Sequence, residues 1–328
     1  MRRRDFILAF GGMALWPFAV RAQQRDTPRR IGVLWHAGSA EQEGDYFTAL
    51  LQGFRDLGYA EGQSVSFVHR FANEQYERFK AQAAELVSLK VDILVAVTRP
   101  AAEAAQAATR TIPIVFVVVP DPVANNFADS LARPGGNMTG LANLALDITG
   151  KRLQLLKEAL PRLRRVAMFV NPTDPIALQR IVNTATEAAG ELGVSMQPFE
   201  ARVPDDIEAA VGTMAKNGME AIFLSNDAML FNERQRIAKA AQARRLPVMF
   251  TNRLGTQAGG LLSYGQDTRI AFRRVAYYAD KIFRGENASD LPIEQPTKFE
   301  MLINLKTART LSIEVPPALI ARADEVIE

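Results

Sequence analysis

The chain has 328 residues and no cysteine; 48% of the residues are hydrophobic, 8% aromatic and 23% charged. These values are typical of a soluble globular protein and argue against a disordered chain, a fibre or a polytopic membrane protein. The lack of cysteine excludes disulfides, thiolate catalysis and cysteine-ligated metals. A length of roughly 300 residues after the first 22 predicts two domains.

The formal net charge of +3 arises in the first 22 residues, which contain Arg2, Arg3, Arg4 and Arg21 against Asp5. The rest of the chain has equal numbers of basic and acidic residues. Nucleic-acid binding depends on a basic face that neutralises phosphates. The balanced charge therefore argues against a nucleic acid as a partner.

The N-terminus has the pattern of an export signal. Arg2-Arg3-Arg4 precedes a mostly apolar stretch, Ile7–Val20, and Val20-Arg21-Ala22 has the small-x-small form of a cleavage site. The run Arg3-Arg4-Asp5-Phe6-Ile7 resembles a twin-arginine signal, and the general secretory route is the alternative. The stretch is too short to cross about 30 Å of hydrocarbon. We expect cleavage after Ala22, a periplasmic protein and no stable membrane insertion.

One strand–helix pattern occurs twice in the remaining sequence. An apolar strand at 29–34 and a helix at 45–57 are repeated by the strand at 164–169 and a helix that ends near Gly193. Later strands at 91–96 and 112–116 correspond, at a nearly constant offset, to those at 219–224 and 246–250. The order of these segments predicts an internal duplication.

Alternating strands and helices predict parallel sheets, because each crossover helix returns the chain in the same direction. We therefore expect an α/β protein with two doubly wound parallel-sheet lobes, joined by hinge strands, and a ligand cleft between them. The expected first lobe is 23–140 plus about 265–292, and the second is 141–264 plus about 293–328. The turn-rich run Gly135-Gly136-Asn137 is the expected hinge.

In open parallel sheets, ligands bind beyond the carboxyl ends of the strands. Two facing lobes would place six loops around one cleft: 35–39, 98–100, 119–122, 171–175, 225–227 and 251–253. The expected ligand-binding residues are Trp35, Ser39, Thr98, Asp121, Asn171, Asp174, Asp227 and Tyr264.

Each role follows from the chemistry of the group. Free N–H groups at helix starts near Ser39 and Thr98 would hold a carboxylate. Asp121 or Asp227 would pair with an amine, and Trp35 and Tyr264, with Phe231 nearby, would stack on an aromatic group. Plainer interpretations remain open: Ser39, Asp174 and Asp227 as helix caps, Asp121 as a turn residue and Trp35 as a core residue.

Catalytic motifs are poorly represented. Of the two histidines, His36 lies in a cleft loop and His69 ends an alternating strand pattern. The sequence has no H-E-x-x-H, G-x-S-x-G, phosphate-loop or dinucleotide-binding motif. We therefore expect no catalytic residue, no cofactor and no metal site.

Several runs are similar to one known family: 58–62, 112–116 with 121–123, 131–141, 262–265, and 291–296 leading into 303–305. The most specific of them is Pro134-Gly135-Gly136-Asn137 followed by Thr139-Gly140. Together they resemble the ABC transporter substrate-binding protein family that includes tryptophan- and tyrosine-binding members. The resemblance covers roughly residues 29–328.

This resemblance implies a type I periplasmic binding protein fold with several hinge strands. It also implies an inner-membrane permease and its ATPase as partners. Many members have a small Gly/Thr-type loop where Thr98-Arg99-Pro100 stands here, so Arg99 would favour an anionic ligand.

The expected function is the capture of a small polar or aromatic carboxylate-bearing solute, such as an amino acid, by hinge closure. Two alternatives use the same cleft: an α/β enzyme, for which His36 is the residue to change, and the ligand-sensing domain of a signalling system. The fold alone does not choose among them.

Overall fold

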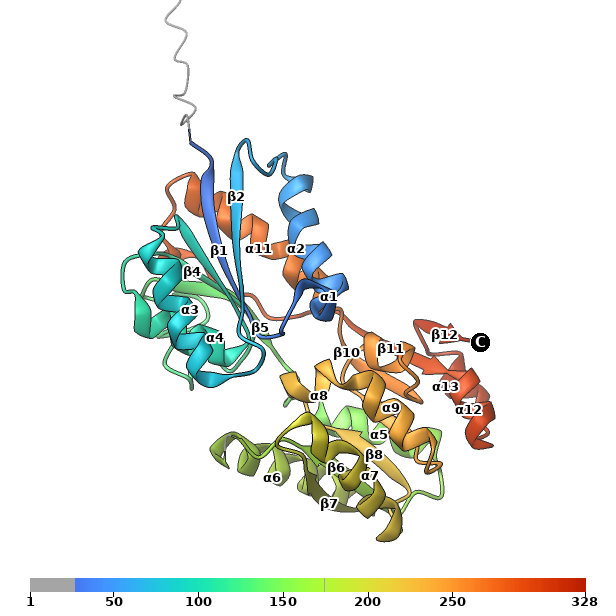
Figure 1. Cartoon of the computed structure of the whole chain (residues 1–328). Coiled ribbons are helices and arrows are strands. Elements are labelled where there is room, and N and C mark those ends of the chain that lie inside the picture. The colour runs from blue at the N-terminus through green and yellow to red at the C-terminus, as the bar shows by residue number, and fades with distance from the viewer. Residues whose placement is uncertain (1–26, 174) are drawn as a thin grey trace, which may run out of the picture.

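The computed structural model describes residues 27–173 and 175–328. The predicted export signal at 1–22 and Asp174 lie outside these ranges. Figure 1 shows two α/β lobes, one above the other, with the chain passing between them. Within the two ranges, no helix combines the length and the apolar character needed to cross a membrane.

The first lobe contains a parallel sheet with the strand order β2-β1-β3-β4-β5. Its strands are β1 (Arg29–Trp35), β2 (Val65–Phe71), β3 (Ile93–Val97), β4 (Ile114–Pro120) and β5 (Met138–Asn143). All five residues of β3 are buried. A strand that is covered on both faces needs apolar side chains on both, which explains its continuous apolar sequence.

Helices cover both faces of this sheet. One face packs against α2 (Asp45–Asp56) and α11 (Thr268–Phe283), and the other against α3 (Tyr76–Ser88) and α4 (Arg99–Ala108). The short α1 (Ala40–Glu43) precedes α2, and a 3₁₀ turn, η2 (Ala288–Asp290), follows α11. Figure 1 shows α11, from late in the chain, beside α2, from its beginning.

The second lobe contains a sheet with the order β12-β11-β10-β9-β8-β6-β7. Its strands are β6 (Arg165–Val170), β7 (Ser195–Glu200), β8 (Ala221–Leu224), β9 (Val248–Phe250), β10 (Leu262–Gln266), β11 (Phe299–Asn304) and β12 (Glu325–Ile327). The β10–β11 pair is antiparallel and the other pairs are parallel.

The helices of the second lobe also form two layers. One apolar cluster joins α5 (Thr149–Ala159), α6 (Pro175–Glu191), α12 (Leu305–Leu311) and α13 (Pro317–Ile320) to the sheet. The opposite cluster contains α7 (Ile207–Lys216), α8 (Ala228–Asn232) and α9 (Arg234–Gln242). The remaining elements are η1 (Pro204–Asp206) and α10 (Arg253–Gln257).

The internal repeat predicted from the sequence is confirmed by the strand orders. The order β2-β1-β3-β4-β5 of the first sheet recurs as β7-β6-β8-β9-β10 in the second. The second sheet is then extended by β11 and β12, which come from the C-terminal part of the chain. The molecule therefore has the predicted α/β class, with two doubly wound lobes.

The chain passes between the lobes at three places. It leaves the first sheet after β5, through 144–148, and enters α5. It returns at Asp267, between β10 and α11, and crosses again at 295–298, before β11. Just before that last crossing, Glu294 pairs with Leu141 of β5.

The expectation that Gly135-Gly136-Asn137 forms the hinge is wrong. This turn precedes β5 and lies wholly in the first lobe, where Gly135 N–H donates to Ser289 O at 3.3 Å. The Asn137 Nδ2 group donates to Ile112 O at 2.8 Å. The chain must complete β5, the edge strand of the first sheet, before it can cross, so the turn and the crossing lie at opposite ends of that strand.

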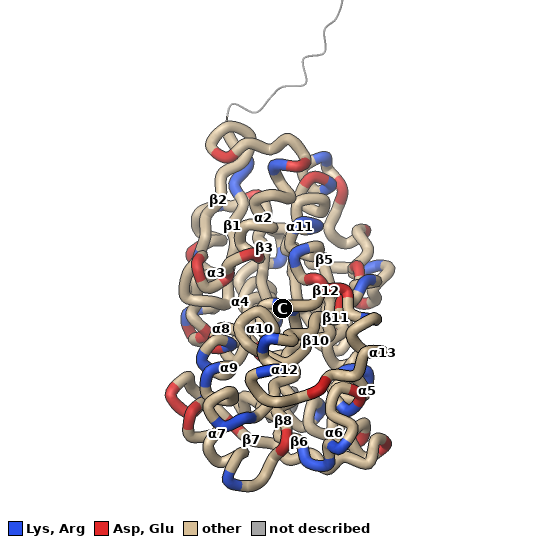
Figure 2. The backbone as a smooth tube through the Cα atoms, turned by 90° about the vertical axis from the view of Figure 1, so that its right-hand side faces the viewer, with Lys and Arg blue, Asp and Glu red and all other residues tan. Residues whose placement is uncertain are grey.

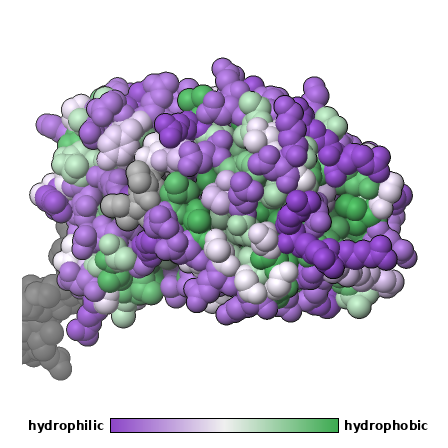
Figure 3. Space-filling view, turned by 90° about the horizontal axis from the view of Figure 1, so that it is seen from below, coloured by the Kyte–Doolittle hydropathy of each residue, from purple (hydrophilic) through white to green (hydrophobic). Residues whose placement is uncertain are grey.

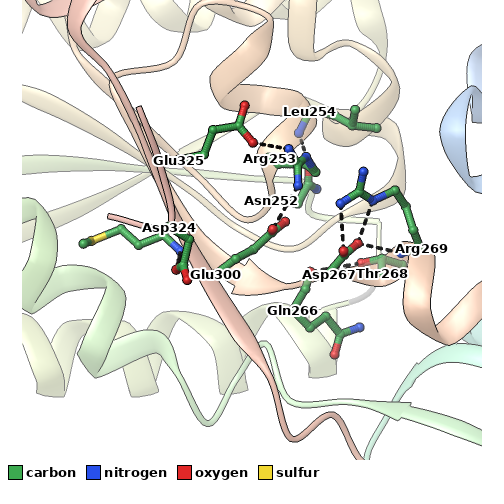
Figure 4. Close-up of polar contacts among 11 residues, drawn as sticks. Asn252, Arg253, Leu254, Gln266, Asp267, Thr268, Arg269, Glu300, Asp324 and Glu325 are labelled. Carbon is green, nitrogen blue, oxygen red and sulfur yellow. Dashed lines mark hydrogen bonds and ion pairs between the residues drawn. The ribbon is translucent and has the colours of Figure 1, made fainter. Parts of the chain in front are cut away.

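A group of ion pairs surrounds the β10–α11 crossing (Figure 4). Arg253, at the start of α10, places Nη1 3.0 Å from Glu300 Oε2 of β11 and also pairs with Glu325 of β12. On the α11 side, Arg269 donates to Asp267 at 2.8 Å. Burial raises the pKa of Glu300, more than Arg253 lowers it. These pairs fix the strands and helix start that the crossing connects.

Charge and hydropathy are mixed on the faces that the figures show. In Figure 2, basic and acidic residues alternate over both lobes. In Figure 3, small groups of hydrophobic residues are separated by hydrophilic ones. Figure 2 shows no long stretch of backbone with charges of one sign, and the face in Figure 3 has no extended apolar region.

Gly53 sets the distance between α2 and α11. A Cβ atom at this position would lie 2.3 Å from Arg273 O and 2.8 Å from Arg273 Cα. These are backbone atoms of α11, which the chain forms after it returns from the second lobe. Backbone atoms of a helix cannot move aside as a flexible side chain would. The glycine allows the two helices to meet at close range.

We predict that Gly53→Ala lowers the free energy of unfolding by about 1–3 kcal/mol, because the added methyl group overpacks this contact. Gly190→Ala is the matched control: Gly190 is also helical, it is exposed, and a Cβ there would have no neighbour within 4 Å. The control is expected to be neutral or slightly stabilising. Urea unfolding followed by circular dichroism measures both, and equal effects would contradict the close-packing argument.

Candidate ligand-binding cleft

The carboxyl ends of both sheets face a shared cavity of about 880 Å³. The end of β4 and the loops that follow β1, β3, β6, β8 and β9 contribute to its lining. One residue from each of these places, in chain order, is His36, Thr98, Pro120, Asn171, Asp227 and Asn252. The cavity has the size and the two-sided lining of a site for a small solute.

The backbone is strained where the first lobe borders this cavity. Thr98 has φ 75° and ψ 168°, a conformation that is normally restricted to glycine. Val118 (φ 61°) and Asp121 (φ 40°) also have positive φ values, and all three residues follow or interrupt the ends of β3 and β4. Such strain persists only where surrounding structure enforces it, and it is typical of ligand sites.

Thr98 directly precedes α4 and lines the cavity. Its Oγ1 atom is buried and has no hydrogen-bond partner within the described ranges. A buried hydroxyl without a partner is costly, and Thr98 therefore keeps an unused donor and acceptor at the wall of the cavity. The next residue, Arg99, forms an ion pair with Glu103 one turn later.

The second lobe contributes Asn171 and Asp227. Asp227 caps α8, where Oδ1 accepts from Leu230 N at 3.0 Å. Asn171 Nδ2 lies 3.4 Å from the same oxygen. Burial raises the pKa of the Asp227 carboxyl, with a smaller contribution from the charge of Glu74, and the hydrogen bonds oppose it.

A hydrogen bond between Glu74 and Asn232 crosses the cleft, and His36 supports Glu74 from within the first lobe. The buried imidazole places Nδ1 2.6 Å from Glu74 Oε1 and Nε2 3.4 Å from Glu43 Oε1. Asn232, on α8 of the second lobe, donates Nδ2 to the same Glu74 oxygen at 3.0 Å. Burial by itself lowers the pKa of His36, but the charges of Glu43 and Glu74 outweigh it and hold the pKa well above its usual value.

Aromatic rings also meet across the cleft. The ring of Tyr46, on α2, lies 5.5 Å from that of Phe231, on α8, with an angle of 20° between their planes. On its other side, Tyr46 stacks on Phe272 of α11 at 5.2 Å. All three residues line the cavity, so its walls can contact an aromatic or apolar group.

The structure brings together three of the expected ligand-binding residues: Thr98, Asn171 and Asp227 all line the cavity. Asp121 instead borders a second, adjoining cavity of about 750 Å³. There its Oδ2 lies 3.4 Å from Nη2 of Arg180, across the gap between the lobes. Asp174 lies outside the described residues.

Three other expectations are corrected. Trp35 is fully buried in the first core, where it donates Nε1 to His69 Nδ1 at 3.0 Å, so stacking on a ligand is wrong for this residue. Tyr264 packs on Phe299 at 5.8 Å and lines neither cavity. Ser39 caps α1 by accepting from Gln42 N and also lines neither cavity. In each case an ordinary core or capping role satisfies the side chain.

Sequence reasoning missed Glu74 and Asn232, whose direct hydrogen bond joins the two lobes. Glu74 follows β2, an edge strand whose loop was not among the six expected ones. It has φ 56°, and so does its neighbour Asn73 at 52°. A polar Asn-Glu pair after an alternating strand was the signal available in the sequence.

The pKa values of the two histidines are shifted in opposite directions, His36 upward and His69 downward. Burial lowers the pKa of His69 to about 4, and its Nδ1 accepts from Trp35, as a neutral ring does. We predict that a ¹H–¹³C NMR titration shows a His36 ring that stays protonated at pH 7 and a His69 ring that stays neutral down to about pH 5. The variants H36Q and H69Q assign the signals. A His36 pKa at or below 6.5 would contradict the Glu43–His36–Glu74 arrangement.

These pKa shifts determine how the free energy of unfolding changes with pH. Because the folded-state pKa of His36 is raised, its contribution to stability is full below about 6.5 and is lost as pH rises through the folded-state pKa. The lowered pKa of His69 makes stability fall as pH drops from about 6.5 toward 4. Urea unfolding at several pH values separates the two slopes: H36Q should remove the first and H69Q the second.

Comparison with known proteins identifies relatives of this architecture. A tyrosine-binding protein of Clostridioides difficile (strain R20291) is 23% identical over 265 residues, which cover 80% of this chain and 75% of the relative. A conserved domain protein from Vibrio cholerae has a TM-score of 0.85 at 26% identity, covering 92% of this chain and all of the other. An ABC domain from Streptococcus pneumonia, in complex with L-Trp, has a TM-score of 0.83 at 21% identity with the same coverage.

The fold that these structures share is that of type I periplasmic binding proteins, as the sequence resemblance implied. A family model described as ABC transporter substrate binding protein matches residues 43–327. The match spans both lobes and all three crossings. The chain belongs to the ABC transporter substrate-binding protein family.

Proposed function

We propose that this protein is the periplasmic substrate-binding component of an ABC importer, which captures a small solute between its lobes. The observation that carries the proposal is the cavity of about 880 Å³ that the carboxyl-end loops of both sheets line together. A solute bound there would contact both lobes at once, so its binding energy would favour the closed arrangement. The family assignment supports this role.

We propose an amino acid with an aromatic side chain as the first candidate ligand. Support comes from the relatives, one of which is named for tyrosine while another is in complex with L-Trp. The cavity offers Tyr46, Phe231 and Phe272 for an aromatic group, and Glu74 and Asp227 for an amine.

The closed arrangement would be stabilised by contacts between the lobes. Phe231 meets Tyr46, Asn232 donates to Glu74, and Arg180 reaches Asp121. We propose that the lobes rotate as units about 144–148, 267 and 295–298, with boundaries close to the division expected from the sequence. The proposed partners are a membrane permease and its ATPase, which would recognise the closed form.

Export and location are part of the same proposal. The sequence pattern of residues 1–22 supports a cleaved signal, by the twin-arginine or the general route. A substrate-binding protein must meet its solute outside the inner membrane, and cleavage after Ala22 would release it there. Mass spectrometry of the protein recovered from a periplasmic fraction tests this: a mature chain that starts at Gln23 supports it, and an intact N-terminus contradicts it.

A ligand screen tests the binding role. Differential scanning fluorimetry of the purified protein with the standard amino acids, sugars and small organic acids should find a ligand that raises the unfolding temperature. Isothermal titration should then give a dissociation constant in the micromolar range or below. Conversion of the bound solute to a product, lost in H36Q, would instead indicate an enzyme.

Thr98→Val is expected to weaken binding of that ligand about three- to tenfold, because one hydrogen bond contributes about 0.5–1.5 kcal/mol. The substitution keeps the shape of the side chain and removes only the unpartnered hydroxyl. Thr256→Val is the matched control, since Thr256 is buried with an equally unpartnered Oγ1 but lines neither cavity. Titration calorimetry compares the two, and equal affinities would rule out a hydrogen bond from Thr98 to the ligand.

A further inference from the structure

The second cavity adjoins the first. It measures about 750 Å³ and shares, among others, Asn143, Ser225 and Asn226 with the first cavity. Most of its remaining lining comes from the loop after β4, the 144–148 crossing, α5 and α6. A solute bound at the shared residues would lie next to both cavities.

Arg152, in the first turn of α5, lines this second cavity. The residue is only 2% exposed. Its Nη2 donates to Leu224 O at 2.8 Å, and its Cζ lies 4.2 Å from the centre of the Phe223 ring. Nε is buried without a hydrogen-bond partner within the described ranges. Among the residues described, no carboxylate forms an ion pair with Arg152, although most other buried or half-buried arginines here have one.

A buried cation without a counter-charge is unusual. Buried charges in proteins are normally paired. Removing an ion from water costs more free energy than one neutral hydrogen bond and one ring contact contribute. Burial lowers the pKa of Arg152 to about 9, so the side chain is still charged at neutral pH. The guanidinium presents a fixed fork of N–H donors that matches the two oxygens of a carboxylate or phosphate.

The charges around the two cavities differ in sign. Among the described residues that line the second cavity, three arginines (Arg99, Arg152 and Arg180) stand against two carboxylates (Asp121 and Asp147). Among those that line the first cavity, four carboxylates (Glu74, Glu103, Asp227 and Glu233) stand against Arg99, Arg202 and His36, whose raised pKa favours its charged form. The described lining therefore has one more acidic than basic group in the first cavity and one more basic than acidic group in the second.

We propose that Arg152 receives an anionic group, a carboxylate or a phosphate, of the captured solute, so that the protein selects anionic or zwitterionic solutes over neutral and cationic ones. Ser225 and Asn226, which border both cavities, lie on the path that such a solute would occupy. The inference rests on the proposed binding function and names the chemical class of its ligand. In this proposal the ligand supplies the negative charge that pairs with Arg152.

The first experiment measures the unfolding temperature without ligand. Arg152→Met removes the charge and keeps the length of the side chain, so it should leave this temperature unchanged or raise it, since an unpaired buried cation is lost. Arg274→Met is the contrast: Arg274 also stacks on a ring, that of Tyr277 at 3.5 Å, but pairs with Glu294 at 2.7 Å and lines neither cavity. It should lower the unfolding temperature. An equal or larger loss in Arg152→Met would show a structural role and overturn the proposal.

The second experiment measures affinity for matched probes by isothermal titration. The carboxylate arm compares L-tryptophan and L-tyrosine with tryptamine and tyramine, which lack only the carboxylate. The phosphate arm compares ribose 5-phosphate with ribose. We expect one anionic probe to bind at least tenfold more tightly than its counterpart, and Arg152→Met to abolish that preference while Arg274→Met retains it. The responding arm identifies the anion.

Arg152→Lys keeps the positive charge but lacks the forked guanidinium, so it should retain a weakened preference for the anionic probe. This variant allows the test to proceed if Arg152→Met does not fold. Wild-type affinity for the anionic probe in Arg152→Met, or the absence of any anionic preference in the wild type, overturns the assignment. An Arg152-dependent preference in the phosphate arm alone would support the site and reject the amino-acid ligand. Amino-acid binding that is independent of Arg152 would support the amino-acid ligand and reject the Arg152 site.

Discussion

The direction of the parallel strands is the constraint on which the rest of the structure depends. Because every crossover helix returns the chain to the same end of the sheet, the strands of each lobe end on the same side. The two sheets are arranged so that those ends face each other, and the loops that follow them enclose one space. Polar groups and helix starts gather there, while the opposite ends carry turns such as Gly135-Gly136.

Three crossings decide how the lobes can move. Loops carry the chain across near 144–148 and 295–298, and Asp267 joins β10 directly to α11. Ion pairs between Arg253 and Glu300, and between Asp267 and Arg269, fix the elements on either side of that shortest link. We propose that these three connections restrict the relative motion of the lobes to opening and closing, as the proposed capture of a solute requires.

The polar groups of the cleft are incompletely satisfied by the protein. Thr98 has a buried hydroxyl without a partner, and Arg152 has a buried guanidinium without a counter-charge among the described residues. Folding alone does not explain retaining such groups, since each one costs stability. In the proposed function, a solute with complementary groups would satisfy them, and this requirement would contribute to selectivity.

The sequence by itself determined the α/β class, the repeat of one strand order, and most of the loops that reach the cleft. These features depend on apolar periodicity and on chain direction, both of which are local properties of the sequence. The family resemblance, carried by runs such as 131–141, was confirmed by the family model. Thr98, Asn171 and Asp227 were named from their places after strands, and their contact with a ligand stays a prediction.

Only the tertiary structure decided which side chains face the cavity. Trp35 and Asp227 both lie near the ends of central strands, yet one points into the core and the other into the cleft. The hydrogen bond between Glu74 and Asn232 joins residues that are 158 positions apart in the sequence. Arg152 looked like an ordinary helical arginine until the fold buried it over Phe223. Burial and charge pairing depend on distances between segments far apart in the chain, and no local pattern of residues encodes those distances.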